Sequence, residues 1–445
     1  MQIDVDKIID DRPISALQLR VFVFCALVAL LDAVDSQAIG VAGPLIRDAL
    51  KLSPVAFSPA YSAGLLGAAI GALAFGPVSD HFGRRPTLVF TTAVFGFFTC
   101  LTALAGSFPV LVIYRVIAGL GLGGATPCFI TLAAEYAPKR NRAMLVSLLW
   151  AGYPLGNAVG GFTTSYVIAH FSWPMVFYTG GIPTLILAAL LFLFLPESVR
   201  FLAATGKRTA AERIARRLDR DLTEGAELMA SRKVPGRRIP LRDLFTEGRA
   251  ATTILLGFVL YFGFWSTTVI VLQTPTLFRE AGMPLSTAAL LVGLYSLVAT
   301  IGMAAAGRLV DRFGAVRALV PPFVAGAVLL GALGFVASSP VAAGAIMLSL
   351  GLTVSVGASG AIALAASSYP TIMRSAGTGW AMAMGRFGQV CSPIAVGAML
   401  SLGLGPARIL AVMAIAPLLG GGCVLLRGAF QSGRAAWDVL IEKSA

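Results

Sequence analysis

Twelve long apolar runs, separated by polar connections, dominate the pattern of residues along the chain. Each run has the length of about 20 residues that a helix needs to cross a hydrocarbon core of about 30 Å. Several runs contain Gly or Pro, which helices tolerate in a bilayer because neighbouring groups satisfy the freed backbone atoms. The pattern predicts an all-α polytopic membrane protein with twelve transmembrane helices, at residues 20–43, 59–79, 87–106, 109–134, 144–168, 174–195, 251–276, 285–307, 318–337, 341–366, 376–400 and 406–427.

The cations between the runs predict the orientation of the chain. They gather in the even-numbered connections, whereas the third, fifth and ninth connections, at 107–108, 170–173 and 338–340, contain no Lys or Arg. The positive-inside rule therefore places both termini and all even connections in the cytoplasm. The cations that define this pattern are Arg84, Arg85, Lys139, Arg140, Arg142, Arg308, Arg312, Arg317 and Arg374; the exceptions, too few to reverse it, are Arg47, Lys51, Arg279 and Arg408.

A long basic segment divides the twelve runs into two sets of six. We expect a cytoplasmic segment at 1–19, a six-helix bundle at 20–195, a basic cytoplasmic linker at 196–250, a second bundle at 251–428 and a cytoplasmic tail at 429–445. Within the linker, residues 210–230 have an amphipathic pattern that includes Ile214, Leu218 and Leu222. This pattern is typical of a helix on the anionic leaflet surface, and the alternative is a solvated helical linker.

Composition agrees with a membrane protein and excludes other classes. The chain is 57% hydrophobic and 12% charged, which is more apolar surface than one soluble core can bury. Although the net charge is +13, the cations lie between apolar runs, so we do not expect nucleic-acid binding. The five cysteines fall inside apolar runs without a Cys-x-x-Cys pair, which excludes a metal site and favours small core residues. The sequence contains no nucleophile–base pair or phosphate-binding loop that would indicate an enzyme. We therefore expect neither an enzymatic activity nor a cofactor.

The two halves of the chain repeat each other. Gly76-Pro-Val-Ser-Asp80-His-Phe-Gly83-Arg84-Arg85 follows the second run, and Gly307-Arg-Leu-Val-Asp311-Arg-Phe-Gly314 follows the eighth. The segment from Ala133 to Arg142 matches the segment from Ala365 to Arg374 in the same way. Two parallel six-helix units therefore share one plan.

The loop Gly76–Arg85 and its partner in the second half resemble the signature loop of the major facilitator superfamily, and Arg115-x-x-x-Gly119-x-Gly121 strengthens the likeness. The resemblance covers essentially the whole chain. It implies two six-helix bundles related by a pseudo-two-fold axis, a substrate site between them near mid-membrane, and alternating access.

Within that superfamily, three segments resemble the aromatic acid:proton symporters, which import benzoate-like acids. They are Asp32-Ala-Val-Asp35, Glu135-Tyr-Ala-Pro-Lys-Arg-Asn-Arg142, and Arg374-Ser-Ala-Gly377-Thr-Gly-Trp380 with Arg386-Phe-Gly388. The family usually has Gly where this chain has Ala33, and Arg or Lys where it has His81. Both departures leave room for a shifted substrate preference.

Four charged residues within predicted membrane spans, where an isolated charge is costly, are candidates for the transport chemistry. Asp32 and Asp35 share one helix face, and mutual repulsion raises one pKa, so we predict a proton site; the alternative is a structural hydrogen-bonded pair. Arg386 cannot lose its charge and is predicted to bind a substrate carboxylate, or to pair with Asp32 or Asp35 when substrate is absent; the alternative is a purely stabilising pair. The resemblance assigns Arg115 to proton transfer, against the alternative of an arginine that snorkels to the interface.

The repeated loops are predicted to form a cytoplasmic gate of ion pairs that part when the gate opens. Glycine supplies tight backbone geometry in these turns. The alternative is that the charges only set topology. The predicted gate residues are Gly76, Asp80, Gly83, Arg84, Arg85, Glu135, Arg142, Asp311 and Arg374.

Aromatic and amide side chains inside apolar runs are candidates for the substrate pocket. An aromatic acid would bind through stacking on its ring and hydrogen bonds to its polar substituents. The alternative for each is helix packing. Besides Arg386 and Asp35, the predicted substrate-binding residues are Tyr153, Asn157, Trp265, Trp380 and Gln389.

These features predict a proton-coupled importer of a small organic anion, most simply an aromatic carboxylate, that works as a monomer in the lipid of the inner membrane. Three alternatives remain open. They are a carrier for a non-aromatic acid such as a dicarboxylate or muconate, an efflux antiporter for amphiphilic compounds, and a transport-like receptor. The midplane Arg386 counts against an apolar efflux pocket.

Overall fold

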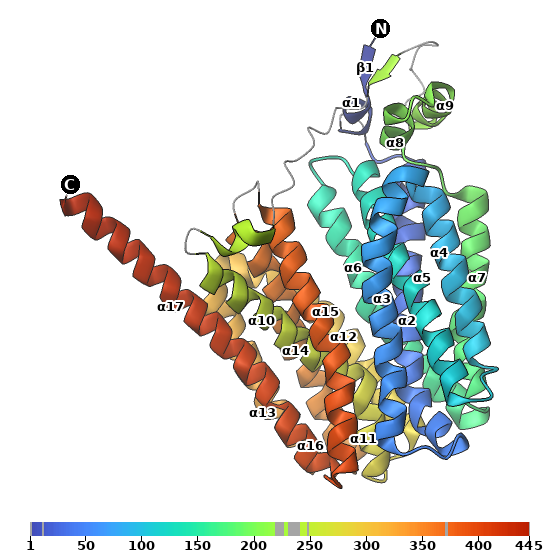
Figure 1. Cartoon of the computed structure of the whole chain (residues 1–445), viewed down its shortest axis with the longest axis vertical. Helices are drawn as coiled ribbons and strands as arrows, with labels where there is room; N and C mark the ends of the chain where they lie inside the picture. The colour runs from blue at the N-terminus through green and yellow to red at the C-terminus, as the bar shows by residue number, and fades with distance from the viewer. Residues whose placement is uncertain are drawn as a thin grey trace. The chain divides into compact units, whose positions relative to one another are not determined.

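The computed structural model describes residues 2–10, 13–218, 227–229, 241–246, 249–369 and 373–444, and Figure 1 shows its elements. The first half contains β1 (Gln2–Asp4), α1 (Val5–Asp10), α2 (Ala16–Ala49), α3 (Pro54–Phe82), α4 (Arg84–Thr102), α5 (Phe108–Tyr136), α6 (Arg142–His170) and α7 (Pro174–Phe194). The central segment contains α8 (Val199–Ala204), α9 (Arg208–Leu218), β2 (Glu227–Met229) and the short 3-10 helix η1 (Leu241–Phe245). The second half contains α10 (Ala250–Thr268), the π-helical turn η2 (Val269–Gln273), α11 (Thr274–Glu280), α12 (Leu285–Phe313), α13 (Ala315–Phe335), α14 (Pro340–Ser368), α15 (Arg374–Ser401), α16 (Pro406–Met413) and α17 (Ile415–Ser444).

Every predicted span falls on helical structure, although the predicted spans 87–106, 174–195 and 318–337 run past the ends of α4, α7 and α13. The seventh span is divided among α10, η2 and α11, and the twelfth between α16 and α17. Within the described residues, nine helical segments are long and apolar enough to cross a membrane. The helices α4, α6 and α15 are not among them, so the number twelve stays a prediction. The two short strands pair in parallel, with Gln2 opposite Glu227.

The chain forms two compact units. Unit 1 comprises residues 1–38, 63–156 and 171–236, and unit 2 comprises residues 39–62, 157–170 and 237–445. The helices α2, α3 and α6 therefore contribute to both units. This division by contacts differs from the predicted bundles at 20–195 and 251–428, which remain predictions.

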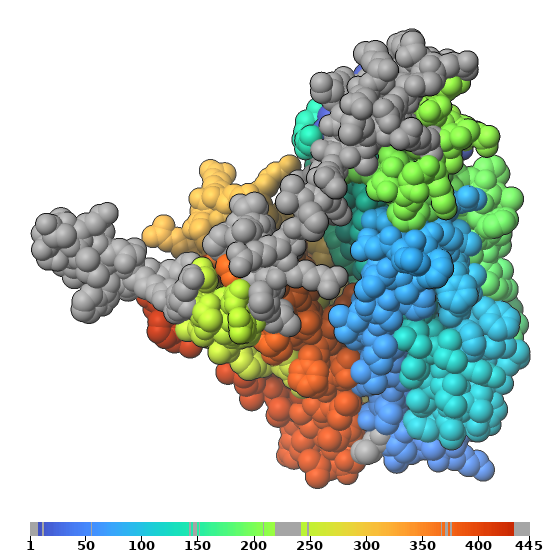
Figure 2. All heavy atoms as spheres, turned by 45° about the horizontal axis from the view of Figure 1, so that its top comes forward, coloured from blue at the N-terminus to red at the C-terminus, as the bar shows by residue number. Residues whose placement is uncertain are grey.

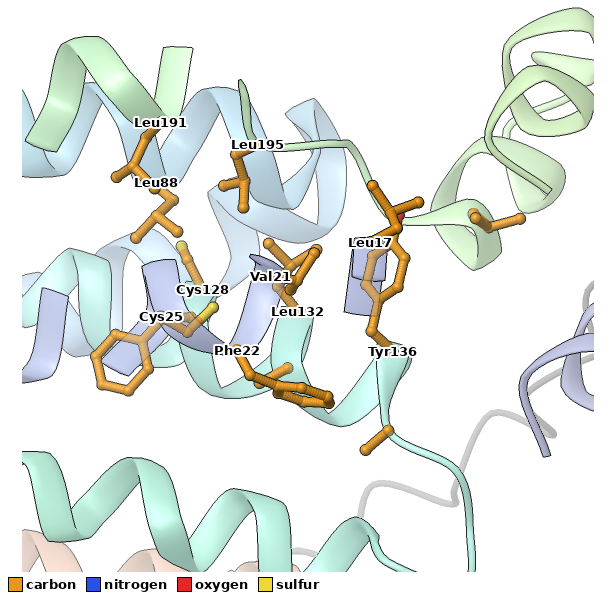
Figure 3. Packing of buried hydrophobic residues seen from close by; sticks show 14 of the residues in the cluster. Leu17, Val21, Phe22, Cys25, Leu88, Cys128, Leu132, Tyr136, Leu191 and Leu195 are labelled. Carbon is orange, nitrogen blue, oxygen red and sulfur yellow. The ribbon is translucent and has the colours of Figure 1, made fainter. Parts of the chain in front are cut away.

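The core of unit 1 is built from apolar side chains at helical spacing. Leu17, Val21 and Cys25 lie four residues apart on α2 and are buried, as are Cys128 and Leu132 on α5 (Figure 3). Leu88 of α4, Leu191 of α7 and Leu195, directly after α7, belong to the same cluster. Both cysteines are free thiols in an apolar environment, as the sequence predicted.

The amphipathic helix of the linker packs against this core. Ala211 and Ala215 of α9 are completely buried in it, and Ile214 and Leu218 pack against it. Figure 2 shows α8 and α9, in green, next to the ends of the unit 1 helices. The apolar face of α9 is therefore covered by protein, and the expectation that it lies on the leaflet surface is wrong for this part. The helix ends at Leu218, and Leu222 lies outside the described residues.

Glycines on α3 and α5 bring these two helices into close contact. A Cβ atom on Gly119 would overlap the backbone oxygen of Gly64, and one on Gly123 would overlap that of Ala68. Small residues allow this close approach between helices in a membrane. The contact fixes the position of Arg115, which lies one turn before Gly119 on α5.

In unit 2, α10 and α15 approach each other in the same way. A Cβ atom on Gly388 of α15 would overlap the backbone oxygen of Tyr261 on α10. Helix α10 continues through η2, a π-helical turn, into α11. Such turns are frequent at functional sites in helices. The close contact places Arg386 on the helix that packs against the aromatic residues of α10.

Candidate functional site

A buried ion pair joins α2 to α5 in unit 1. The guanidinium of Arg115 donates from Nη1 to Asp35 Oδ1 at 3.0 Å and from Nη2 to Asp35 Oδ2 at 2.9 Å. Thr99 Oγ1 of α4 donates to Asp35 Oδ1 at 3.0 Å, and Phe177 places its ring centroid 5.9 Å from the guanidinium. The side chains of Arg115 and Asp35 are only 4% and 1% exposed. The arrangement is a fully desolvated, bidentate carboxylate–guanidinium pair.

Only one of the two side chains in this pair can gain or lose a proton. An arginine stays protonated at any working pH, so only Asp35 can change its charge. Protonation would remove the anion from the bidentate contact and leave a buried guanidinium without its counter-ion. Removal of one partner of a buried pair costs roughly 3–5 kcal/mol, which is enough to shift a conformational equilibrium strongly.

The structure contradicts one predicted pairing of Asp35 and one alternative for Arg115. The partner of Asp35 is Arg115 and not Arg386, because α4 and α5 pack on the face of α2 that carries Asp35. Arg115 is buried and paired, so the alternative of a snorkelling arginine is wrong. Asp32 is also buried, at 8% exposure, and Ser36 Oγ donates to its Oδ1 at 3.4 Å.

A second cluster surrounds Arg84 at the first residue of α4. Its Nη2 lies 2.7 Å from Asp80 Oδ1 in the last turn of α3 and 3.5 Å from Glu135 Oε1 near the end of α5. The ring of Phe201 on α8 lies 5.2 Å from the guanidinium. Arg84 is buried, whereas the Asp80 side chain is 71% exposed. The predicted pairing of Arg84 with Asp80 and Glu135 is therefore present within unit 1.

Glu197, which was not among the predicted gate residues, completes this cluster. Its Oε1 accepts hydrogen bonds from the backbone N–H groups of Arg84 and Arg85, at 3.1 and 3.2 Å, and so caps the positive end of α4. Burial raises the pKa of Glu197, and the backbone donors and Arg84 oppose this effect. A lone carboxylate directly after the apolar run of α7, at an end rich in arginine, was the available signal. Glu197 therefore joins Asp80 and Glu135 as an anion of the cluster.

The other predicted gate residues are more dispersed. Gly76 lies inside α3, and a Cβ added to it would meet no atom within 4 Å, so the expectation that it shapes a tight turn is wrong. Asp311 is exposed and forms no ion pair with any described residue. Arg85 places its guanidinium 5.9 Å from the Phe192 ring centroid. The side chains of Arg142 and Arg374 lie outside the described residues.

Substitution of Gly83 by Ala should destabilise the protein more than the same change at Gly314 or Gly76. Gly83 has φ 111° and ψ 157°, a region open essentially to glycine alone, and a Cβ there would overlap Glu197 Oε2. Gly314, with φ 76° and ψ 158°, has the same strain, roughly 1–3 kcal/mol, but open space around it. Gly76 is helical, so Ala there should be neutral or stabilising by up to about 1 kcal/mol.

Thermal unfolding of the three variants in detergent measures this order. Equal melting temperatures for Gly83→Ala and Gly314→Ala would show that the contact between Gly83 and Glu197 contributes nothing, and equal values for Gly83→Ala and Gly76→Ala would also contradict the backbone strain.

Arg386 of unit 2 lies on α15 among polar and aromatic groups. Its Nη1 donates to Gln389 Oε1 at 3.2 Å, and within the described residues it forms no ion pair. On the adjoining helix α10, the rings of Tyr261 and Trp265 lie 5.7 Å apart, and Tyr261 lies 6.0 Å from Phe387. A half-buried guanidinium with only a neutral partner retains donors for an anion.

Polar atoms without partners mark two other predicted pocket residues. Asn157 Oδ1 and Trp265 Nε1 are buried and have no hydrogen-bond partner among the described residues. Buried polar atoms are normally paired, so such atoms are candidates for ligand contacts. Trp380 Nε1 shares this property, but its ring packs edge-to-face on Phe245, 5.3 Å away, in an apolar cluster, which favours packing. Tyr153 is half-buried on α6.

The profile of the Major Facilitator Superfamily matches residues 25–393 and, in a second match, residues 253–437. The chain belongs to the major facilitator superfamily. The resemblance stated from the repeated loops is thereby confirmed. The members of this superfamily that the chain resembles are transporters rather than enzymes.

The protein is similar to several transporters along most of the length of both chains. It is 34% identical to a gallate transporter of Pseudomonas putida over 91% of this chain and 90% of the relative. It is 33% identical to a 4-hydroxybenzoate transporter of Acinetobacter baylyi, over 87% and 86%, and 33% identical to a 3-(3-hydroxy-phenyl)propionate transporter of Escherichia coli, over 90% and 92%.

Solved structures agree on the fold of this superfamily member. A D-xylose-proton symporter matches with a TM-score of 0.71 at 20% identity, over 92% of this chain and 97% of the other. The xylose transporter of Escherichia coli in an inward-open conformation matches with a TM-score of 0.70 at 19% identity, over 92% and 95%. The predicted all-α major facilitator fold of a multi-pass membrane protein is therefore confirmed.

Proposed function

We propose that this protein imports a small aromatic carboxylate together with protons across the inner membrane. The observation that carries the substrate class is the agreement among its relatives, because gallate, 4-hydroxybenzoate and hydroxyphenylpropionate all combine a hydroxylated ring with a carboxylate. Each of these relatives aligns over most of both chains, so the similarity includes the helices that carry the candidate site. The relatives support the class of substrate and leave the individual acid to experiment.

The buried pair of Asp35 and Arg115 supports the proton-coupling part of the proposal. When Asp35 takes up a proton, the bidentate contact loses its negative charge, and the helix packing that depends on the pair is weakened. Because Asp35 is bonded to both α4 and α5, its protonation state acts on two helices of unit 1 at once. Release of the proton on the other side restores the pair and resets the carrier.

Arg386 supports the substrate-binding part. A substrate carboxylate can accept hydrogen bonds from the guanidinium N–H groups of Arg386, including the one that donates to Gln389 in this structure. Such a charge-assisted contact is stronger than the hydrogen bond to the neutral amide. The aromatic rings on α10 offer stacking surfaces for the ring of the acid. The unpaired Trp265 Nε1 and Asn157 Oδ1 offer one donor and one acceptor for its hydroxyl groups.

The same proposal assigns an orientation and a gate. The positive-inside pattern supports both termini in the cytoplasm and the Arg84 cluster on the cytoplasmic side. There Arg84, Asp80, Glu135 and Glu197 form a group whose contacts part or close with movement of α3, α4 and α5. We infer that the protein acts as a monomer, since one chain carries both repeats.

Uptake by purified protein in liposomes tests this proposal. Labelled gallate, 4-hydroxybenzoate and benzoate are compared with muconate and succinate, with and without an inward proton gradient. We expect the gradient to drive accumulation of at least one aromatic acid and of neither aliphatic acid. Accumulation of only the aliphatic acids would overturn the substrate class, and gradient-driven extrusion of apolar dyes would overturn the direction.

A further inference from the structure

Thr99 of α4 directs its hydroxyl to another helix. Thr87, Thr91 and Thr102 of α4 each donate to the backbone oxygen four residues earlier in the chain, at 2.8 Å. A buried threonine in a helix commonly satisfies its hydroxyl in this local way. Thr99 is completely buried as well, but its Oγ1 donates to Asp35 Oδ1 of α2 at 3.0 Å. The contact with Asp35 therefore replaces the local bond that the other three threonines form.

The hydroxyl of Thr99 makes the two oxygen atoms of the Asp35 carboxylate unequal. Oδ1 accepts from both Thr99 Oγ1 and Arg115 Nη1, each at 3.0 Å. Oδ2 accepts from Arg115 Nη2 at 2.9 Å, its one hydrogen bond within the described residues. Each carboxylate oxygen has about two acceptor positions, so these donors occupy both positions of Oδ1 and leave one on Oδ2. Without Thr99, the bidentate contact with Arg115 would leave the two oxygens alike.

The internal repeat shows that the fold does not need polar side chains at these positions. Helix α13 begins 231 residues after α4, and α14 begins 232 residues after α5, so the counterparts of Thr99 and Arg115 are Leu330 and Met347. Both counterparts are completely buried in an apolar cluster of unit 2. The polar network of unit 1 therefore has a role besides helix packing.

We propose that Thr99 is a positioning residue for proton coupling, which directs the transported proton to Oδ2 of Asp35 and stabilises the charged carboxylate. This inference rests on the proposed function and deepens its proton site. The incoming proton forms an O–H bond at the open position of Oδ2, because both positions of Oδ1 are taken. The hydroxyl oxygen of a carboxylic acid is a poor acceptor, so the contact with Arg115 Nη2 weakens first. The bond from Thr99 then holds Asp35 on α4 while the ion pair loosens.

Other ionisable groups also surround the carboxylate of Asp35. Arg115 of α5 stays charged at any working pH. Cys100 of α4 presents a half-buried thiol, and Asp32 lies one turn earlier on α2 and is buried. From α7, Gly180 lies against the backbone of Asp35 and brings no ionisable group. Replacement of the threonine leaves all of these groups in place, so a change in the pH dependence of transport reports on the lost hydroxyl.

Thr99→Val tests this role, with Thr91→Val as the matched control. The valine has nearly the shape of threonine without its hydroxyl, so the charged carboxylate loses a donor that the protonated form needs less. The protonated form then persists to higher pH. We expect a rise of about half a unit to one unit in the external pH at which proteoliposomes take up 4-hydroxybenzoate at half the maximal initial rate. Thr91→Val removes a hydroxyl that bonds within α4 and should leave this pH unchanged.

Two further substitutions of Thr99 keep the test decisive if the valine variant does not fold. Thr99→Ser retains the donor and should keep the wild-type value, and Thr99→Cys, with a weak donor, should raise it less than valine does. A wild-type value in the valine or cysteine variant, or an equal rise in Thr91→Val, would overturn the role of Thr99. If uptake by the wild type does not depend on the external pH, proton coupling fails, and with it the proposed function itself.

Discussion

Asp35→Asn should abolish proton-driven accumulation of the acid and leave only passive equilibration. The substitution removes the one group of the buried pair that can change its charge. It also leaves Arg115 buried without an anion, which should lower the free energy of unfolding by roughly 3–5 kcal/mol. Accumulation ratios in proteoliposomes and thermal unfolding in detergent measure the two effects separately.

The double variant Asp35→Asn with Arg115→Gln separates a proton site from a structural pair. Removal of both charges of a buried pair is far less costly than removal of one, so most of the lost stability should return. Accumulation should stay absent, because neither side chain that replaces the pair can take up or release a proton. If the double variant again accumulates substrate against a gradient, the pair is structural and protons couple elsewhere.

Arg386→Ala should weaken binding of the aromatic acid roughly 10- to 100-fold, as expected for the loss of hydrogen bonds from a charged donor. The reason is that a carboxylate in a low-dielectric site needs a fixed counter-charge, and Arg386 forms no ion pair with any described residue. Calorimetric titration of the purified protein with 4-hydroxybenzoate measures the change in Kd.

Two controls accompany the substitution of Arg386. Gln389→Ala removes the neutral partner and should change the Kd by less than about tenfold, while freeing the guanidinium for the ligand. Arg386→Lys retains the charge but not the planar fork, so it should give an intermediate Kd. A wild-type Kd in Arg386→Ala would exclude this residue from the substrate site.

The sequence predicted the helices and the family because both depend on local patterns. Runs of about 20 apolar residues are sufficient to place a span, and the repeated loops around Asp80 and Asp311 are sufficient to suggest the fold. The partner of Asp35 depends instead on the rotation of α2 and on the close packing of α3 on α5 at Gly119 and Gly123. These quantities are not encoded in the spacing of charged residues along one helix, and the prediction of Arg386 as a partner was therefore wrong.

The cluster around Arg84 shows the same limit. The motif indicated Gly76 and Gly83 alike, yet only Gly83 has the backbone conformation and the close contact that require glycine. Glu197 lies more than a hundred residues from Arg84 in sequence, and only the fold brings its carboxylate to the start of α4. Arg47 and Arg279 are exceptions to the positive-inside rule in the sequence, and only the fold pairs them with Glu280 and Asp48.

Movement of protons with substrate tests the central claim most directly. Addition of 4-hydroxybenzoate to lightly buffered, energy-depleted cells that produce the protein should make the external medium more alkaline, because each acid anion that enters takes protons with it. Proton-coupled import through Asp35 predicts this change for the wild type and its absence for Asp35→Asn, whose residual substrate binding should be measured in parallel. Uptake of the acid by the wild type without any alkalinisation would contradict proton-coupled import.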